Sequence, residues 1–308
     1  MRFSAQLPTD RVQLGAELNS AAAIGEMARA LEAAGLDAGY VTEHPFPPDA
    51  WLAGGGHHAL DPFVALTAAA AGTTRLRLHT NVLVLPYRNP FLTAKAVASL
   101  DAVSGGRVIM GIAAGYLEGE YRALGADFAH RNDIADDALV AIKRGWSGES
   151  VRCAGPGYEA TGNTMLPRPV QQPHPPIWVG GNSGRAIRRA AEHAQGWSPF
   201  PVPAAFGRRT RTAALESVED LAAGIGKLRE HAAKHGRSDA FDVNFVPFGL
   251  RMNAPPAPDP DAFCEQLVRL AEIGVTWVSI GLPAPSRAAY CEHAARFGEV
   301  VVARMRRA

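Results

Sequence analysis

The chain has 308 residues, of which 47% are hydrophobic and 20% are charged, and its formal net charge is +1. This composition is typical of a globular protein with a large core, and a charge so near zero argues against nucleic acid or an anionic membrane as the main partner. The chain has three widely spaced cysteines, no long apolar segment at its start and no run of about 18 apolar residues. These features predict a cytoplasmic protein without disulfides, secretion signal or membrane span.

Short apolar runs alternate with longer amphipathic, alanine-rich runs along the whole chain. We expect strands at 3–8, 38–43, 76–85, 107–113, 176–180, 196–200, 243–250 and 276–282. We expect helices near 20–34, 61–72, 91–103, 117–124, 133–146, 184–194, 215–235, 260–273 and 286–304. This alternation predicts βαβ units that build a parallel sheet.

Eight strand–helix units are the number that closes a (β/α)8 TIM barrel, so we expect one α/β domain over residues 1–308. A doubly wound open sheet is the alternative, but no G-x-G-x-x-G motif follows the first strand. Three segments exceed ordinary loop length: 44–60, 147–175 with a hairpin around 155–157, and 200–214. We expect these insertions to cover the C-terminal mouth, where such barrels build their active sites.

A carboxylate and an imidazole stand together at the end of the second strand. Glu43 and His44 are a residue pair suited to proton transfer. The alternative is that His44 caps a turn before Pro45 or packs on Trp51 within its own loop.

Three polar residues precede the apolar run 82–85 on the third strand. They are His79, Thr80 and Asn81. A buried polar side chain without a partner costs a few kcal/mol. The strand is therefore either frayed here or faces something that is not protein.

The segment 180–185 reads Gly-Gly-Asn-Ser-Gly-Arg and joins the fifth strand directly to a helix. Glycines let the backbone approach an anion, and the N–H groups at a helix start point toward it. The segment predicts a phosphate site, to which Arg185 would add positive charge. The alternative is an ordinary βα turn in which Asn182 or Ser183 caps the helix.

Other titratable residues give weaker signals. The histidines at 57–58 have no acidic or thiolate partner at ligand spacing, so we assign no metal. Glu118, Glu120 and Arg122 are typical of a solvated helix face, and Glu120 could instead pair with Arg131. The chain contains no G-x-S-x-G motif, so it offers no support for nucleophilic hydrolysis.

Three stretches of the chain resemble the luciferase-like flavin and deazaflavin oxidoreductases, a TIM-barrel superfamily. They are VTEHPFPP after the second strand, TNVLVLPYRNPFLTAKAVASLDAVSGGRVIMGIAAGYLEGEYRALGADFAHR across the third and fourth strands, and PRPVQQPHPPIWVGGNSGRAIRRAAEHAQGW around the fifth. The resemblance spans nearly the whole chain. It implies a bulge in the third strand at Asn81–Val82, frequently with a cis peptide, that supports one face of the cofactor's ring.

The resemblance also implies where the cofactor binds. The implied cofactor-binding residues are Asn81, Val82, Gly115, Tyr116, Gly180, Gly181, Asn182, Ser183 and Arg185. His44 matches a histidine that lies near the ring in deazaflavin-using members, and we expect it to handle a proton together with Glu43. Sugar-phosphate dehydrogenases of the family carry a glutamate directly after the strand-four glycine. This chain has Tyr116 there, so a sugar phosphate is not the expected substrate.

The expected function is hydride transfer between coenzyme F420 and a small organic substrate. The forms TEHPFPP and GGNSGRA resemble most the coenzyme F420-dependent members, and the Ala, Gly and Arg content is reminiscent of actinobacteria. Alternatives are an FMN-dependent monooxygenase served by a separate flavin reductase, a flavin-binding protein without turnover, and a hydrolase using Glu43 and Glu120. Homodimers are frequent among relatives. Arg208, Arg209 and Arg211 could meet the glutamate tail of coenzyme F420.

Overall fold

Eight parallel strands close into a barrel in the order β1-β10-β9-β8-β7-β4-β3-β2. The computed structural model describes residues 1–205, 207, 212–238, 240–250 and 257–307. The barrel strands are β1 (Arg2–Gln6), β2 (Ala38–Val41), β3 (Arg77–Val84), β4 (Val108–Ala113), β7 (Ile177–Gly180), β8 (Gly196–Ser198), β9 (Asp242–Phe245) and β10 (Trp277–Ile280). All eight lie where the sequence predicted strands, so the prediction of a (β/α)8 barrel is confirmed. The three arginines predicted to meet a glutamate tail lie outside the described residues.

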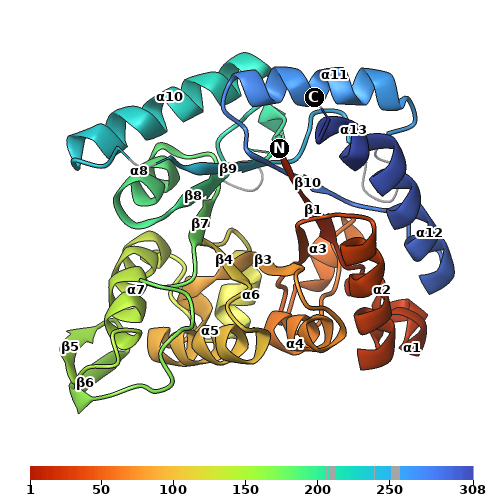
Figure 1. The fold of residues 1–308 in the computed structure, drawn as a ribbon. Coiled ribbons are helices and arrows are strands. Elements are labelled where there is room, and N and C mark those ends of the chain that lie inside the picture. Colours follow the sequence, from red (N-terminus) through yellow and green to blue (C-terminus); the bar gives the residue numbers. More distant parts are fainter. Residues whose placement is uncertain (206, 208–211, 239, 251–256, 308) are drawn as a thin grey trace.

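The helices form a ring around the barrel (Figure 1). The longer ones are α2 (Ala21–Ala33), α4 (Pro62–Gly72), α5 (Pro90–Ser104), α7 (Arg131–Gly145), α8 (Gly184–His193), α10 (Val218–Lys234), α11 (Pro260–Glu272) and α12 (Arg287–Phe297). Short helical segments are η1 (Val12–Leu14), α1 (Ala16–Asn19), α3 (Asp49–Ala53), η2 (Leu85–Tyr87), α6 (Glu118–Ala123) and α13 (Ala303–Met305). Of the helices described, none is both long and apolar enough to cross a lipid bilayer.

Two predicted elements end earlier than expected. The strand predicted over 243–250 stops at Phe245, because Pro247 has no N–H to donate and Gly249 adopts a left-handed φ of 79°. The helix predicted over 286–304 is interrupted by a π-helical turn, η3 (Gly298–Val302). There the chain packs closely on α2's end: a Cβ added to Gly298 would lie 2.4 Å from the Ala34 carbonyl oxygen.

The predicted hairpin is present, but it does not cover the C-terminal mouth. It consists of β5 (Val151–Gly155) and β6 (Tyr158–Asn163), and the Tyr158 hydroxyl donates to Asp137 on α7 at 2.6 Å. Figure 1 shows the hairpin beside α7, outside the helix ring. The chain then returns to the N-terminal end of the barrel, where Gln171 donates to the Val108 carbonyl at 2.8 Å. This location follows from topology, because the segment leads into a parallel strand and must reach the end where strands begin.

The polar start of β3 is only partly open to the mouth, so the expectation that these polar residues face something other than protein is wrong for His79 and Thr80. His79 is fully buried inside the barrel, 3.5 Å from the Ser4 hydroxyl and packed edge-on against Trp178 with ring centroids 4.8 Å apart. Thr80 is buried and donates to the Gly111 carbonyl at 2.9 Å. Only Asn81 is half-buried.

Buried His79 is expected to make stability depend on pH. Burial, aided by the charge of Arg77, lowers the pKa of His79 to about 3. The unfolded chain therefore takes up a proton below about pH 6.5 that the folded chain does not. We expect this histidine to reduce the free energy of unfolding by about 2 kcal/mol between pH 6.5 and pH 5.

Denaturant unfolding of the wild type and His79→Gln at several pH values measures this effect. On acidification, the free energy of unfolding of the variant should fall less steeply than that of the wild type. The difference between the two pH slopes should correspond to about one bound proton. Parallel pH dependences of the two proteins would contradict the assignment.

Candidate active site

Strand β3 bulges as it approaches the C-terminal mouth of the barrel. Its register with β4 shifts between Thr80 and Leu83, so Asn81 and Val82 together lie opposite Gly111. The Asn81–Val82 peptide bond is cis. Asn81 and Val82 are half-buried, although the residues on either side are buried. The bulge that the family resemblance implied is confirmed.

Glycines let neighbouring backbones pack against this bulge. A Cβ added to Gly111 would lie 2.0 Å from the Thr80 carbonyl oxygen, and one added to Gly180 would lie 3.1 Å from Val82 Cγ1. The Val82 side chain thus lies directly over the end of β7. Since both positions lack a side chain, β3 can pack closely against β4 and β7 at the bulge.

His44 is held by a buried carboxylate from the segment after β4. Its Nδ1 lies 3.4 Å from Glu120 Oε2, and the two side chains are 12% and 1% exposed. The main-chain N–H of Phe46 donates to Glu120 Oε1 at 2.9 Å, and the Tyr87 hydroxyl donates to Oε2 at 2.8 Å. One carboxylate therefore joins the segments that follow β2, β3 and β4.

The hydrogen bonds decide the charge of Glu120. Burial alone would raise the pKa of this carboxyl, but the bonds from His44, Phe46 N–H and Tyr87 hold its pKa below the ordinary value. An ionised Glu120 can only accept, so it fixes Nδ1 of His44 as the protonated nitrogen. Nε2 is then the nitrogen of His44 that is left to exchange a proton.

His44 also packs against aromatic rings of its own loop. Its ring centroid lies 4.3 Å from that of Trp51 and 4.9 Å from that of His57. Burial lowers the pKa of His57, and the neighbouring His44 adds to this, against a hydrogen bond with His58. The packing on Trp51 that the sequence offered as an alternative is thus present together with the carboxylate contact. Within the described residues, no group of three or more potential ligands brings these histidines together around a metal position.

Glu43 is turned toward β3 instead of serving His44. Its Oε2 accepts the main-chain N–H of Val84 at 2.6 Å, and its Oε1 forms an ion pair with Arg88 at 2.5 Å. Burial raises the pKa of Glu43 despite the opposing charge of Arg88 and the Val84 N–H. The carboxylate partner of His44 is Glu120, so the expectation that Glu43 and His44 act as a pair is corrected. Glu43 ties the end of β2 to the end of β3.

Replacing Glu43 with glutamine is expected to affect stability more than chemistry. Loss of the charged bond to Arg88 should lower the free energy of unfolding by about 1–3 kcal/mol. Turnover per folded molecule should change less than about threefold, because Glu43 binds the Val84 N–H and Arg88 and is not the carboxylate that holds His44. Unfolding curves and kcat measured on the same preparations test this, and a large fall in kcat at unchanged stability would contradict it.

The loop after β7 is fastened on both sides by its own polar residues. The Asn182 amide donates to the carbonyls of Phe200 and Ala213 at 2.9 and 3.0 Å and accepts from Phe200 N–H at 3.1 Å. Ser183 caps α8 by accepting the Ala186 N–H at 3.2 Å, and Gly181 has a left-handed φ of 105°. The helix-capping alternative therefore holds for Ser183. The N–H groups at the start of α8 remain the donors that a phosphate would meet.

Arg185 is engaged by carboxylates of a neighbouring helix. Its guanidinium lies 2.5 Å from Asp133 and 2.6 Å from Asp136, both on α7, and Asp136 also binds buried Arg189. Because two carboxylates already compensate its charge, Arg185 attaches α8 to α7. This arrangement corrects the expectation of a free charge for the phosphate.

The segment after β4 carries the expected Gly115 and Tyr116, and it also brings Glu120 into the site. Gly115 adopts a left-handed φ of 70°, and a Cβ there would lie 2.6 Å from Val84 Cγ1. Burial raises the pKa of Tyr116, and the charge of Glu120 adds to this. The predicted solvated face of α6 is wrong for Glu120, as is its pairing with Arg131, which instead stacks on Phe128 at 4.0 Å.

The sequence pattern placed Glu120 on a solvated helix face or beside Arg131, and it did not single out Tyr87; the structure joins both residues at the mouth. The available signal was that Glu120 follows strand four, whose C-terminal end adjoins those of the neighbouring strands.

TIM-barrel enzymes carry their active sites at this end of the barrel, and the fold and mouth described above define a protein of that class. Within it, residues 1–269 match the luciferase-like monooxygenase family. The chain belongs to this family.

Individual relatives differ in the cofactors that their names state. The chain is 31% identical over 268 residues to an uncharacterized protein of Mycobacterium tuberculosis, covering 83% of each chain. It is 29% identical over 180 residues to an FMNH2-dependent dimethylsulfone monooxygenase of Pseudomonas putida, covering 58% of this chain and 46% of that one. The structure of a coenzyme F420-dependent tetrahydromethanopterin reductase from Methanopyrus kandleri shares the fold, with a TM-score of 0.74, 18% identity and 99% coverage of both chains.

Proposed function

We propose that the C-terminal mouth binds coenzyme F420 and that the protein is an oxidoreductase transferring a hydride between this deazaflavin and a small organic substrate. The observation that carries the proposal is the bulge at Asn81–Val82, which presents two half-buried residues beside Gly180 at the mouth. A flat ring needs such a partly exposed surface, and a side chain at Gly180 would crowd Val82 there.

The residues at this mouth fit the parts of a deazaflavin. Asn81 and Val82 would support one face of the ring, with Gly115 and Tyr116 at its edge. The N–H groups of Gly181 to Gly184 would bind the phosphate, as Asn182 and Ser183 already fix this loop against the segment after β8 and against α8. When bound, the deazaflavin supplies the hydride-transferring carbon.

His44 moves the accompanying proton in this proposal. Glu120 holds Nδ1–H, so Nε2 accepts a proton from an alcohol being oxidised or, when charged, donates one to a carbonyl being reduced. Glu120 and Tyr87 are positioning residues, because they act on the substrate only through His44. Trp51 and His57 shield the imidazole from water by packing on it.

An FMN-dependent monooxygenase is the second candidate, favoured by the similarity to the dimethylsulfone monooxygenase. Such an enzyme would need a partner reductase to supply reduced flavin. A homodimer and a flavin-binding protein without turnover are further possibilities within the same family.

Anaerobic and aerobic turnover separate these candidates. Purified protein is incubated with reduced coenzyme F420 and a panel of small carbonyl and ene substrates, and reoxidation of the coenzyme is followed optically. Substrate-dependent reoxidation without O2 is the expected result. Reaction only with reduced FMN and O2 would replace the proposal by the monooxygenase, and binding without turnover across the panel would contradict catalysis of this kind.

A further inference from the structure

A second pocket lies at the opposite, N-terminal end of the barrel. Its volume is 380 Å³, within the lower range of small-molecule sites. Arg2, Arg77 and Trp277 line it from the first residues of β1, β3 and β10, and Asp37 lines it from the residue before β2. None of these residues belongs to the candidate active site, which the β-strands separate from this end.

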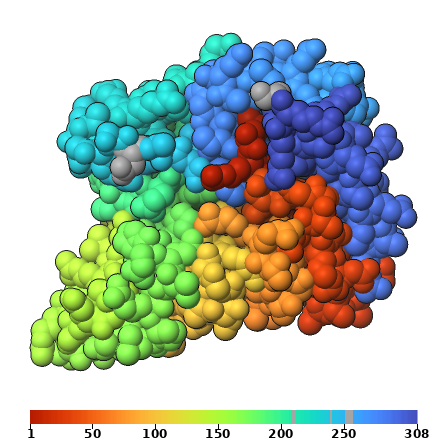
Figure 2. Space-filling view, in the orientation of Figure 1, coloured from red at the N-terminus to blue at the C-terminus, as the bar shows by residue number. Residues whose placement is uncertain are grey.

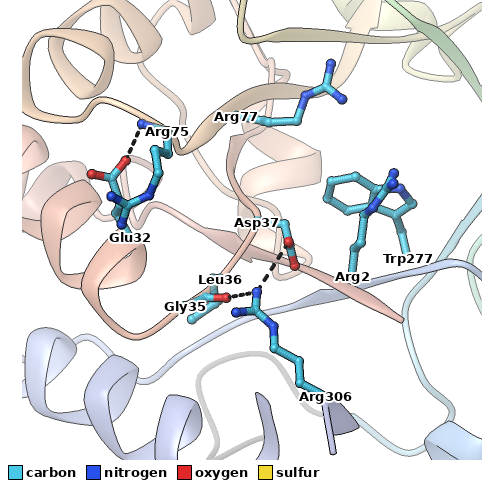
Figure 3. Close-up of a pocket in the computed structure, with 9 residues that line it drawn as sticks. All are labelled: Arg2, Glu32, Gly35, Leu36, Asp37, Arg75, Arg77, Trp277 and Arg306. Atoms are coloured by element: carbon cyan, nitrogen blue, oxygen red, sulfur yellow. Dashed lines mark hydrogen bonds and ion pairs between the residues drawn. The ribbon is translucent and has the colours of Figure 1, made fainter. Parts of the chain in front are cut away.

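Four arginines gather in this pocket from distant parts of the chain. They are Arg2, Arg75, Arg77 and Arg306. Figure 3 shows Arg75 beside Glu32, Arg306 beside Asp37, and Arg2 and Arg77 on the side of Trp277. The first and last segments of the chain meet here, as the red and blue surfaces in Figure 2 show. Among the described residues, two carboxylates, Glu32 and Asp37, line the same pocket, so the described part of its lining carries an excess of two positive charges.

The carboxylates are already satisfied by other donors of the protein. Glu32 accepts the main-chain N–H groups of residues 74–76 at 2.6–3.1 Å. Asp37 accepts Phe3 N–H at 2.9 Å, and Arg306 approaches it to 3.4 Å while donating to the Gly35 carbonyl. Neither carboxylate therefore needs Arg2, Arg75 or Arg77.

The arginines keep some of their donors free. Arg77 Nη2 donates to the Gln171 side chain at 2.9 Å and to the Val108 carbonyl at 3.4 Å, which leaves its Nη1 and Nε without a partner among the described residues. Arg2 stacks on Trp277 at 5.3 Å and lies 3.9 Å from Asp242, with its side chain 57% exposed. Arg75 is exposed, and within the described residues its guanidinium has no hydrogen-bond or ion-pair partner. Burial lowers the pKa of Arg77, and the charge of Arg2 adds to this against the carboxylate of Asp242. An anion between Arg2 and Arg77 would relieve that repulsion.

We propose that this pocket binds a small phosphorylated molecule, with Arg2, Arg75 and Arg77 donating to the phosphoryl oxygens. Guanidinium groups suit this ligand because their planar forks bind phosphate through paired charge-assisted hydrogen bonds. The excess of two charges favours a dianionic phosphoryl group over a single carboxylate. A volume of 380 Å³ leaves space for an organic part beside the phosphoryl group.

Calorimetric titration of the intact protein tests the site. Glycerol 3-phosphate, inorganic phosphate and citrate are titrated at constant ionic strength into the wild type, Arg2→Gln, Arg75→Gln and Arg152→Gln. Arg152 is a matched control, since it is an exposed arginine on the β5–β6 hairpin and does not line this pocket. Thermal unfolding of each variant shows that it is folded.

The expected result is saturable binding of glycerol 3-phosphate to the wild type. Arg2→Gln and Arg75→Gln should each weaken it about 10- to 100-fold, because each removes hydrogen bonds to a charged group. Arg152→Gln should bind like the wild type. Tighter binding of the monoester than of inorganic phosphate supports a site for an organic phosphate, and equal binding supports recognition of the phosphoryl group itself.

Four outcomes would overturn the proposal. They are no saturable heat, wild-type affinity in both pocket variants, equal weakening in Arg152→Gln, and binding of citrate but of neither phosphate. Wild-type affinity in the pocket variants would locate the bound phosphate elsewhere, for example at the loop after β7. The test needs no redox cofactor, so its result is independent of the proposed oxidoreductase function.

Discussion

Replacing His44 with alanine is expected to lower kcat of the proposed hydride transfer about 100- to 10,000-fold, the usual contribution of a positioned acid–base group. The dissociation constant of the cofactor should change less than about threefold, since the imidazole moves a proton and is not part of the phosphate or ring contacts. Stopped-flow turnover and fluorescence titration on one preparation measure both quantities.

Controls separate the proton-transfer role of His44 from its packing role. His44→Phe retains a ring that can pack on Trp51 but cannot exchange a proton, so it should be as inactive as His44→Ala. Glu120→Gln keeps the size of the carboxylate and should reduce kcat by a smaller factor. His58→Ala, an exposed histidine of the same loop, should behave like the wild type. Full turnover in His44→Phe would remove His44 from the chemistry.

Gly111→Ala is expected to damage both the fold and the cofactor site. The new Cβ would lie 2.0 Å from the Thr80 carbonyl oxygen and 3.0 Å from His79 Nε2. Main chain must move to relieve the first contact, and it is the main chain that forms the bulge. We expect a loss of about 2–4 kcal/mol in the free energy of unfolding and at least about tenfold weaker cofactor binding.

Gly226→Ala is the matched control for this substitution. Gly226 is exposed in the middle of α10, and a Cβ there would have no neighbour within 4 Å. Alanine should therefore raise the free energy of unfolding by about 0.5–1 kcal/mol. Denaturant unfolding and cofactor titration of both variants provide the comparison. A Gly111→Ala protein with wild-type stability and affinity would show that the bulge does not depend on this close approach.

Much of the fold follows from local patterns in the sequence. Short apolar runs predict the strands, and longer amphipathic runs predict the helices between them. The strands at 38–41 and 277–280 were both predicted in this way. Ends of elements were less predictable. The last long helix is interrupted where Gly298 packs on Ala34, and that contact joins residues far apart in the chain.

The candidate site was predictable in location but not in pairing. The strand-end position of His44 and the family resemblance at Asn81–Val82 located the mouth and the bulge. Which carboxylate meets His44 could not be predicted, because Glu43 is adjacent in sequence yet turns to Arg88, whereas Glu120 arrives from the other side of β3. Likewise, the positive charge of Arg185 gave no sign that Asp133 and Asp136 would compensate it.

A side-by-side titration of the purified protein with coenzyme F420 and FMN, followed by fluorescence, tests the central claim most directly. The proposal predicts saturable micromolar binding of coenzyme F420 and much weaker binding of FMN, with the deazaflavin affinity reduced in Gly111→Ala and retained in His44→Ala. Tight binding of FMN with no binding of coenzyme F420 would contradict the deazaflavin assignment and favour the monooxygenase. Binding of neither would contradict the cofactor site itself.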